Sequence, residues 1–252
     1  MKNDFIIAIQ CALAVVVQGE PPAVAEGKPI KPSVALSASS NAVGRTGSSK
    51  PTLGESLIIR NTFNRGPESW CSYDYHWSIV AKGHNIFIMT TWAGSGGVGD
   101  SGYVWSDETR WSADTPESPV SLLPFITYTR WVDRDALDLR DAQVSFYLRA
   151  DDFQFHGSQC YFWVVGPGGR WHFTSQPLTV GKDQWPEKPN VLRLVNDVSL
   201  WHHSWPSDPP TPALLNQVLS RAVSYGISLV GFGQEPRGKF CMDEFEIRLA
   251  KE

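Results

Sequence analysis

The chain has 252 residues, of which 42% are hydrophobic, and a formal net charge of −4 at neutral pH. A chain of this length and composition can bury a core, so disorder throughout is excluded. Its 22 Lys and Arg residues stand singly among 26 Asp and Glu residues, and they form no basic stripe that could neutralise a run of phosphates. We therefore expect no nucleic-acid partner.

The amino-terminal residues 1–27 have the pattern of an export signal. Lys2 precedes an apolar run over residues 5–17, and residues 23–25 (Ala-Val-Ala) offer a small-x-small cleavage pattern. The run is too short to span a bilayer, and a buried first strand is the alternative interpretation. We expect a protein without a membrane span that is secreted or works in the periplasm or cell envelope.

A linker and a single domain are expected after the signal. Residues 28–52 are mainly small or polar and lack sustained apolar periodicity, which is typical of a flexible linker. The globular domain is expected at residues 53–252. Removal of the signal would leave three cysteines, so at most one disulfide could form within the chain; they are Cys71, Cys160 and Cys241.

Alternation of apolar and polar side chains predicts strands along the domain. In residues 142–149, Val144, Phe146 and Leu148 point one way and the intervening side chains point the other. Similar patterns cover residues 57–63, 86–92, 160–165, 169–174, 227–233 and 240–249. With 21 Gly and 18 Pro in the turns, these segments predict an all-β fold, a β-sandwich of the jelly-roll type.

One short helix is expected at residues 212–225. Thr211 can cap it, Pro212 suits the first helical position, and apolar side chains recur at helical spacing. Gly226 is expected to end it. The apolar stripe predicts packing against the sandwich.

The last predicted strand places an acidic residue among apolar ones. Alternation puts Asp243 on the same side as Phe245, Ile247 and Leu249. An unpaired carboxylate is costly on a core face, so it must meet a cation, a group of backbone N–H donors, or water at the sheet edge. A salt bridge, a turn hydrogen bond and a structural Ca²⁺, which favours oxygen ligands, all stay open.

The two ends of the domain resemble a known group of proteins. Residues 57–66, followed by Trp70, and residues 243–247 are similar to the opening and closing segments of calcium-containing, galactose-binding-like jelly-roll carbohydrate-binding modules. The resemblance leaves the middle of the domain unmatched. It implies a structural calcium held by Asp243 and by Asn64, which stands where the family has Glu.

No organic cofactor is expected. The glycine-rich residues 94–102 lack the Lys and Ser/Thr of a phosphate-binding loop, so a nucleotide site is not predicted there.

The tryptophans suggest the ligand. All 11 lie between Trp70 and Trp205, and flat indole rings suit the faces of sugars. We expect non-catalytic binding of glycan or polysaccharide by Trp-lined loops and a polar sheet face. The expected site residues are Trp105, Trp201 and Trp205 as stacking rings, with Arg170, His172 and Tyr147 beside them.

Two alternatives remain at this stage. One is a polysaccharide-degrading enzyme on the same fold. A hydrolase would use paired carboxylates, for which the candidates are Asp107 with Glu108, Asp114 with Glu117, and Asp151 with Asp152; a lyase could use Tyr128, Tyr147, His156 or His172. The other alternative is a structural or protein-interaction sandwich whose tryptophans are internal. The positions of the tryptophan side chains separate a binder from such a scaffold.

Overall fold

The structure is a computed structural model that describes residues 57–80, 85–113, 121–204 and 211–250. The expected signal, the expected linker and the start of the domain at residue 53 lie outside these residues, and the domain limits stay a prediction. Among the described residues, no helix is long and apolar enough to cross a membrane.

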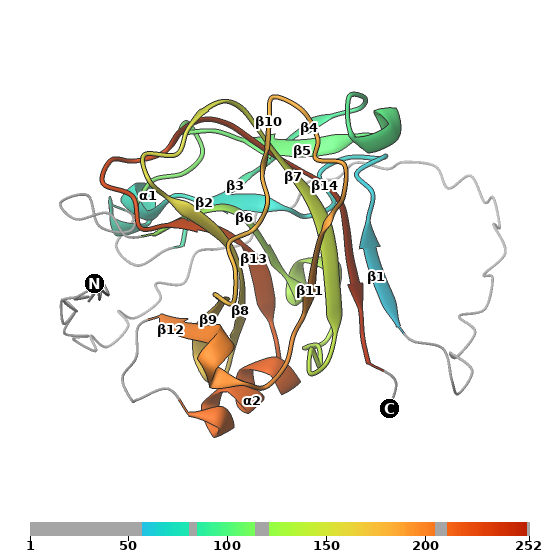
Figure 1. Cartoon of the computed structure of the whole chain (residues 1–252), viewed down its shortest axis with the longest axis vertical. Helices are drawn as coiled ribbons and strands as arrows, with labels where there is room; N and C mark the ends of the chain where they lie inside the picture. Colours follow the sequence, from blue (N-terminus) through green and yellow to red (C-terminus); the bar gives the residue numbers. More distant parts are fainter. Residues whose placement is uncertain (1–56, 81–84, 114–120, 205–210, 251–252) are drawn as a thin grey trace, which may run out of the picture. The chain divides into compact units, whose positions relative to one another are not determined.

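Two seven-stranded sheets form a sandwich, so the predicted all-β class is confirmed (Figure 1). Sheet A contains β1 (Ile58–Asn61), β4 (Thr91–Ala93), β5 (Tyr103–Ser106), β7 (Gln143–Gln154), β10 (Gly181–Lys182), β11 (Asn190–Arg193) and β14 (Arg237–Arg248). Sheet B contains β2 (Cys71–Tyr73), β3 (Phe87–Met89), β6 (Ser121–Tyr128), β8 (Gln159–Gly166), β9 (Gly169–Phe173), β12 (Trp201–Ser204) and β13 (Ser224–Val230).

Long-range antiparallel pairing holds each sheet together. In sheet A, β14 runs beside β7 for most of its length, and β1 pairs with the end of β14 so that Ile59 lies opposite Ile247. The two ends of the described chain are therefore neighbours. In sheet B, β13 lies between β6 and β8. The inward side chains of both sheets, such as Phe146 and Phe162, fill one apolar core.

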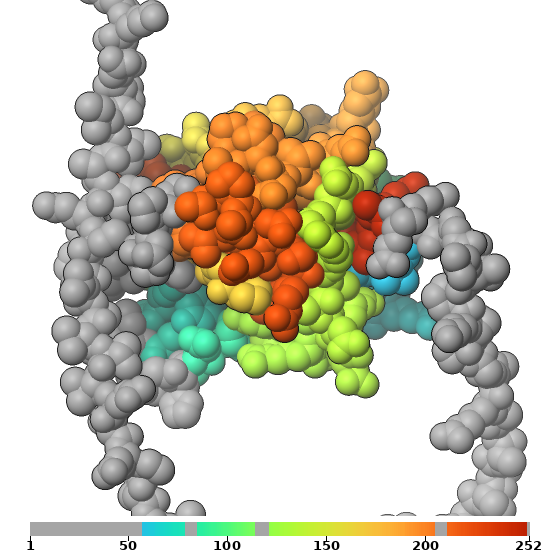
Figure 2. Space-filling view, turned by 90° about the horizontal axis from the view of Figure 1, so that it is seen from below, coloured from blue at the N-terminus to red at the C-terminus, as the bar shows by residue number. Residues whose placement is uncertain are grey.

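Two α-helices and three short 3-10 turns complete the described fold. They are α1 (Tyr75–Val80), α2 (Pro212–Ser220), η1 (Val98–Asp100), η2 (Thr129–Val132) and η3 (Val198–Leu200). α2 lies at the lower end of the sandwich in Figure 1, and the orange-red segment that contains it faces the viewer in Figure 2, which looks from below. Leu215, Val218 and Leu219 enter the core from this helix.

The predicted helix begins where expected and ends early. The hydroxyl of Thr211 accepts a hydrogen bond from the backbone N–H of Leu214, and Pro212 occupies the first turn. The helix ends at Ser220 rather than at residue 225, because Ser224 and Tyr225 pair as strand residues with both β6 and β8. The expectation that Gly226 ends the helix is therefore wrong, since Gly226 lies within β13.

A β-bulge in β14 reverses the predicted orientation of Asp243. Phe240 and Met242 point into the core, and so do Phe245 and Ile247. The register against β7 shifts between Asp243 and Glu246, and Glu244 has a φ of 47°. The extra residue places Asp243 on the outer face of sheet A, so the expectation of a core-facing carboxylate is corrected.

Candidate functional site

The outer face of sheet B carries an aromatic pocket of about 290 Å³. Its rings meet mostly edge to face: the centroids of Tyr73 and Tyr75 lie 4.4 Å apart, and those of Phe87 and Tyr128 lie 5.6 Å apart. Trp131 packs 5.0 Å from Phe87 at its margin. The pocket is lined by Tyr73, Tyr75, Asn85, Phe87, Leu123, Ile126, Tyr128, Trp163, Val165 and Arg170.

Strand alternation puts these side chains outside the main core. In β8, Phe162 and Val164 point into the core, so Trp163 and Val165 point out to the pocket. In β9, Trp171 packs in the core and Arg170 takes the opposite face. A second, smaller apolar cluster therefore covers the outside of sheet B.

Polar groups converge on this aromatic wall. Arg170 donates from Nη1 to the Tyr75 hydroxyl at 2.9 Å, and its guanidinium lies 5.9 Å from the Trp163 ring centroid. The Tyr73 hydroxyl donates to Oδ1 of Asn85 at 3.0 Å. Arg170 is the one charged residue among the described residues that line the pocket. An apolar wall with a few positioned donors is the usual make-up of a small-ligand site.

His172 lies on the same face of β9 as Arg170, and each of the two residues is only 3% exposed. Its Nδ1 lies 2.8 Å from the hydroxyl oxygen of Ser204 on β12. Burial lowers the pKa of His172 well below its usual range, and the charges of Arg170 and His202 lower it further. His172 is therefore neutral at neutral pH.

This burial gives a pH prediction. Below about pH 6.5 the unfolded chain binds a proton at residue 172 that the folded protein does not bind. The folded-state pKa is the lower one, so stability falls as the pH falls from about 6.5 towards the folded-state pKa. His172→Gln should reduce the loss of melting temperature between about pH 7 and pH 5. His76→Gln, on α1, is the control, and an unchanged pH slope in the His172 variant would contradict the assignment.

The predicted ligand residues do not form one site. Arg170 and His172 lie on the outer face of sheet B, whereas Trp105 on β5 and Tyr147 on β7 belong to the outer face of sheet A. Trp201 is 6% exposed, packs against Phe173 and donates from Nε1 to the carbonyl of Val195. The expectation of a stacking ring at Trp201 is therefore corrected, because its inward position in β12 makes it a core residue. Trp205 lies outside the described residues.

The sequence interpretation also missed site residues. Tyr73 lies on a short strand and Tyr128, named only as a lyase candidate, ends a strand buried on both faces, and alternation reveals neither strand. Phe87 lies within the strand predicted at residues 86–92 but was not named as a site residue. The spacing Tyr73-x-Tyr75 and the proximity of Tyr128 to Trp131 are the sequence signals that could have found them.

Cations and aromatic rings cover sheet A around Trp105. Lys239 Nζ lies 5.1 Å from the Trp105 ring centroid and donates to the Tyr103 hydroxyl at 2.8 Å. Arg149 lies 4.8 Å from the Tyr103 ring centroid and 4.5 Å from that of Trp185. Because Arg149 Nη1 and Trp185 Nε1 both donate to the Gly96 carbonyl, these contacts fix the glycine-rich residues 94–102 on the sheet.

Asp243 holds the same glycine-rich segment. Its Oδ2 accepts hydrogen bonds from the backbone N–H of Val98 and the hydroxyl of Ser101, both at 2.7 Å. Its Oδ1 accepts from the N–H of Glu244 at 2.6 Å. Burial raises the pKa of Asp243, and the same donors oppose that rise. Of the compensating partners considered from the sequence, backbone donors are the ones present.

These donors bear on the expected calcium. Oδ1 of Asn64 also accepts a hydrogen bond, from the N–H of Gly102 at 3.3 Å. N–H and O–H groups that point at an oxygen take the place a cation would need, so Asp243 and Asn64 as arranged do not fit a calcium ion. No group of three or more His, Cys, Asp or Glu residues that could hold a metal occurs in the described part of the chain. The calcium site that the resemblance implies stays a prediction, and titration of the protein with Ca²⁺ tests it.

The groups considered for catalysis have other partners or positions. Asp151 pairs with Arg149 and Lys239. Glu108 accepts from the N–H of Gly238, and Asp107 accepts from Thr109. Asp114 and Glu117 lie outside the described residues. The free thiols of Cys71, Cys160 and Cys241 are buried.

No protein-family model and no curated protein matches the chain. Solved structures resemble it at low identity. The CBM22-1 xylan-binding domain of Paenibacillus barcinonensis Xyn10C is 11% identical over 81% of this chain and 99% of that domain, with a TM-score of 0.42. The L4b domain of human laminin alpha-2 is 8% identical over 78% and 99%, at 0.43. The xylan-binding module CBM15 is 12% identical over 79% and 99%, at 0.36. At such values these likenesses do not decide the function.

Proposed function

We propose that the chain binds polysaccharide without catalysis, in the aromatic pocket of sheet B. The observation that carries this proposal is the convergence of the Tyr73, Phe87 and Tyr128 rings on a pocket whose charged group is Arg170. Ring faces can stack on the C–H faces of sugars, and the Arg170 and Asn85 side chains can bond to hydroxyls. A pocket of about 290 Å³ is at the small end for a ligand site, so it suits a short stretch of a longer glycan.

The tryptophan positions support only in part the alternative of a structural sandwich with internal tryptophans. Trp70, Trp111, Trp171 and Trp201 are buried in the core, as a structural sandwich requires. The Tyr73, Phe87 and Tyr128 rings of the pocket are only half-buried, however, and together they form an aromatic surface outside the core. This difference favours a binding protein over a pure scaffold.

The main test removes pocket rings. Tyr128→Ala combined with Tyr73→Ala should weaken binding roughly 10-fold or more, because each stacked ring contributes on the order of 1 kcal/mol. Binding is measured by affinity electrophoresis in xylan, mixed-linkage β-glucan and pectin. Trp92→Ala removes a 41% exposed ring on sheet A and is the matched control. Equal mobility of wild type and double variant in every gel that retards the wild type would refute the pocket.

An enzyme would give a different result in the same material. Release of reducing ends or of unsaturated sugars from these polysaccharides would replace the proposal by the hydrolase or lyase alternative. An extracellular or envelope location accompanies the proposal, because cell-wall polysaccharides such as xylan lie outside the cytoplasm. Amino-terminal sequencing of the protein after export tests whether residues 1–27 are removed.

A further inference from the structure

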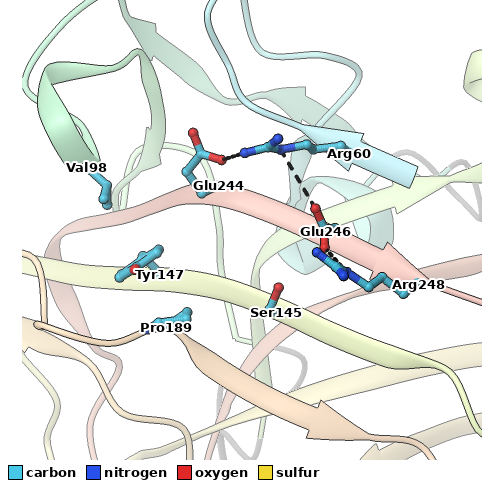
Figure 3. Close-up of a pocket in the computed structure, with 8 residues that line it drawn as sticks. All are labelled: Arg60, Val98, Ser145, Tyr147, Pro189, Glu244, Glu246 and Arg248. Carbon is cyan, nitrogen blue, oxygen red and sulfur yellow. Dashed lines mark hydrogen bonds and ion pairs between the residues drawn. The ribbon is translucent and has the colours of Figure 1, made fainter. Parts of the chain in front are cut away.

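A second groove lies on the opposite side of the sandwich, on the outer face of sheet A (Figure 3). It has a volume of about 360 Å³. Its floor is Ser145 and Tyr147 of β7, and its charged side is formed by β1 and β14. It is lined by Arg60, Val98, Ser145, Tyr147, Pro189, Glu244, Glu246 and Arg248.

The bulge in β14 builds this groove. Glu244 has a φ of 47°, in the left-handed region that a residue other than glycine occupies at a cost. Its side chain accepts a hydrogen bond from Arg60 Nη2 at 2.8 Å beside the groove. Bulges often redirect a side chain next to a binding site. The strained backbone of Glu244 therefore places its side chain in the lining of the groove.

The end wall of the groove is fixed as well. Val98 lines it, and the backbone N–H of Val98 is held by Asp243 at 2.7 Å. A Cβ on Gly97 would lie 2.4 Å from Oδ2 of Asp243, so the close approach of this segment requires glycine. The groove is thus preorganised by buried contacts, which lowers the entropy cost of binding.

The charges of the groove alternate and cancel. Glu246 lies between two arginines, 2.5 Å from Arg248 Nε and 3.8 Å from Arg60 Nε (Figure 3). The Glu246 side chain is 14% exposed, while those of Arg60 and Arg248 are each 57% exposed. Two cations and two anions give no net charge to attract an ion. They do present donors and acceptors side by side, as vicinal hydroxyl groups require.

We propose that this groove is a second saccharide site, for a neutral sugar residue that stacks on Tyr147 and bonds through its hydroxyls to Arg248 and Glu246. It lies on the other sheet from the aromatic pocket, so one protein can hold two glycan chains. The inference goes beyond the proposed function, because the groove can bind sugar whether or not the aromatic pocket does.

The test measures the sheet A groove in a protein whose aromatic pocket has been removed. Xylohexaose and cellohexaose are titrated calorimetrically into the Tyr73→Ala/Tyr128→Ala protein. Residual binding should remain for at least one of these neutral probes. Adding Tyr147→Ala or Arg248→Gln should weaken it roughly 10-fold, whereas Arg140→Gln, which removes an exposed arginine elsewhere, should leave it unchanged.

The outcomes separate the two proposals. Residual binding that is lost with Tyr147→Ala and with Arg248→Gln supports the groove. Absence of residual binding, or residual binding that both substitutions leave unchanged, overturns the groove proposal. Neither outcome bears on the aromatic pocket, which is tested by the Tyr73→Ala/Tyr128→Ala protein. Circular dichroism of each protein keeps unfolding apart from loss of the site, and Arg248→Gln serves if Tyr147→Ala does not fold.

Discussion

Asp243→Ala is expected to lower the free energy of unfolding by several kcal/mol. The substitution leaves the Val98 N–H and the Glu244 N–H without their acceptor, whereas the Ser101 hydroxyl can donate instead to the Val98 carbonyl at 2.8 Å. Each buried donor left unpaired costs about 1–3 kcal/mol, although water entering the cavity returns part of this. Asp243 itself is 0% exposed, so bulk water does not reach the unpaired donors without a change in the surrounding structure. Urea denaturation followed by tryptophan fluorescence measures the change.

The same variant separates hydrogen-bond compensation from a metal. If the donors alone neutralise Asp243, the wild-type melting temperature is the same in Ca²⁺ and in chelator, and Asp243→Ala lowers it equally in both. Asp133→Asn, which changes an exposed acid in a turn, should have little effect. A melting temperature that rises with Ca²⁺ in the wild type and not in Asp243→Ala would instead establish the calcium site that the family resemblance implies.

Strands with one face on the core were predictable from sequence. The alternation of residues 142–149 gave β7, and similar patterns gave β8, β9 and most of β14. β6 was not found because it is buried on both faces: Leu122 and Phe125 pack in the core, while Leu123 and Ile126 pack beneath the aromatic pocket. A strand covered on both sides has no two-residue pattern.

Alternation also fails where a strand changes phase. Asp243 and Phe245 share one face in a regular strand, and the bulge between Asp243 and Glu246 separates them. No residue in this stretch signals a bulge, since Glu244 takes the left-handed conformation without being glycine. The expectation that Asp243 must meet a cation, a group of backbone N–H donors or water rested on the cost of a buried charge, and backbone N–H donors do meet it.

Only part of the aromatic pocket could be predicted from the sequence, because several of its rings come from segments without a clear two-residue pattern. Arg170 was found because β9 alternates cleanly between Trp171 and its neighbours. The emphasis on tryptophan was misleading at Trp201, which serves the core, while tyrosines from β2, α1 and β6 line the pocket. Which aromatic rings face outward depends on the pairing of β2, β6 and β8, and residues far apart in the sequence decide that pairing.

Gly226→Ala is expected to disrupt the centre of sheet B and the aromatic pocket together. Gly226 lies in β13 between β6 and β8, opposite Ile126 and Trp163. A Cβ at this position would lie 2.0 Å from the Phe125 carbonyl oxygen and 2.9 Å from Cζ2 of Trp163. The first contact is with backbone, so the strand itself must move.

Overpacking of this kind costs about 1–3 kcal/mol, and more where the backbone cannot relax. β13 is held on both sides, so we expect the upper part of that range, with a matching loss of glycan affinity because Trp163 lines the pocket. Gly233→Ala is the matched control, since a Cβ there meets nothing within 4 Å. Thermal unfolding and affinity electrophoresis of both variants measure the two effects. A Gly226→Ala protein with wild-type stability and wild-type binding would mean that β13 does not pass between β6 and β8 beneath the pocket.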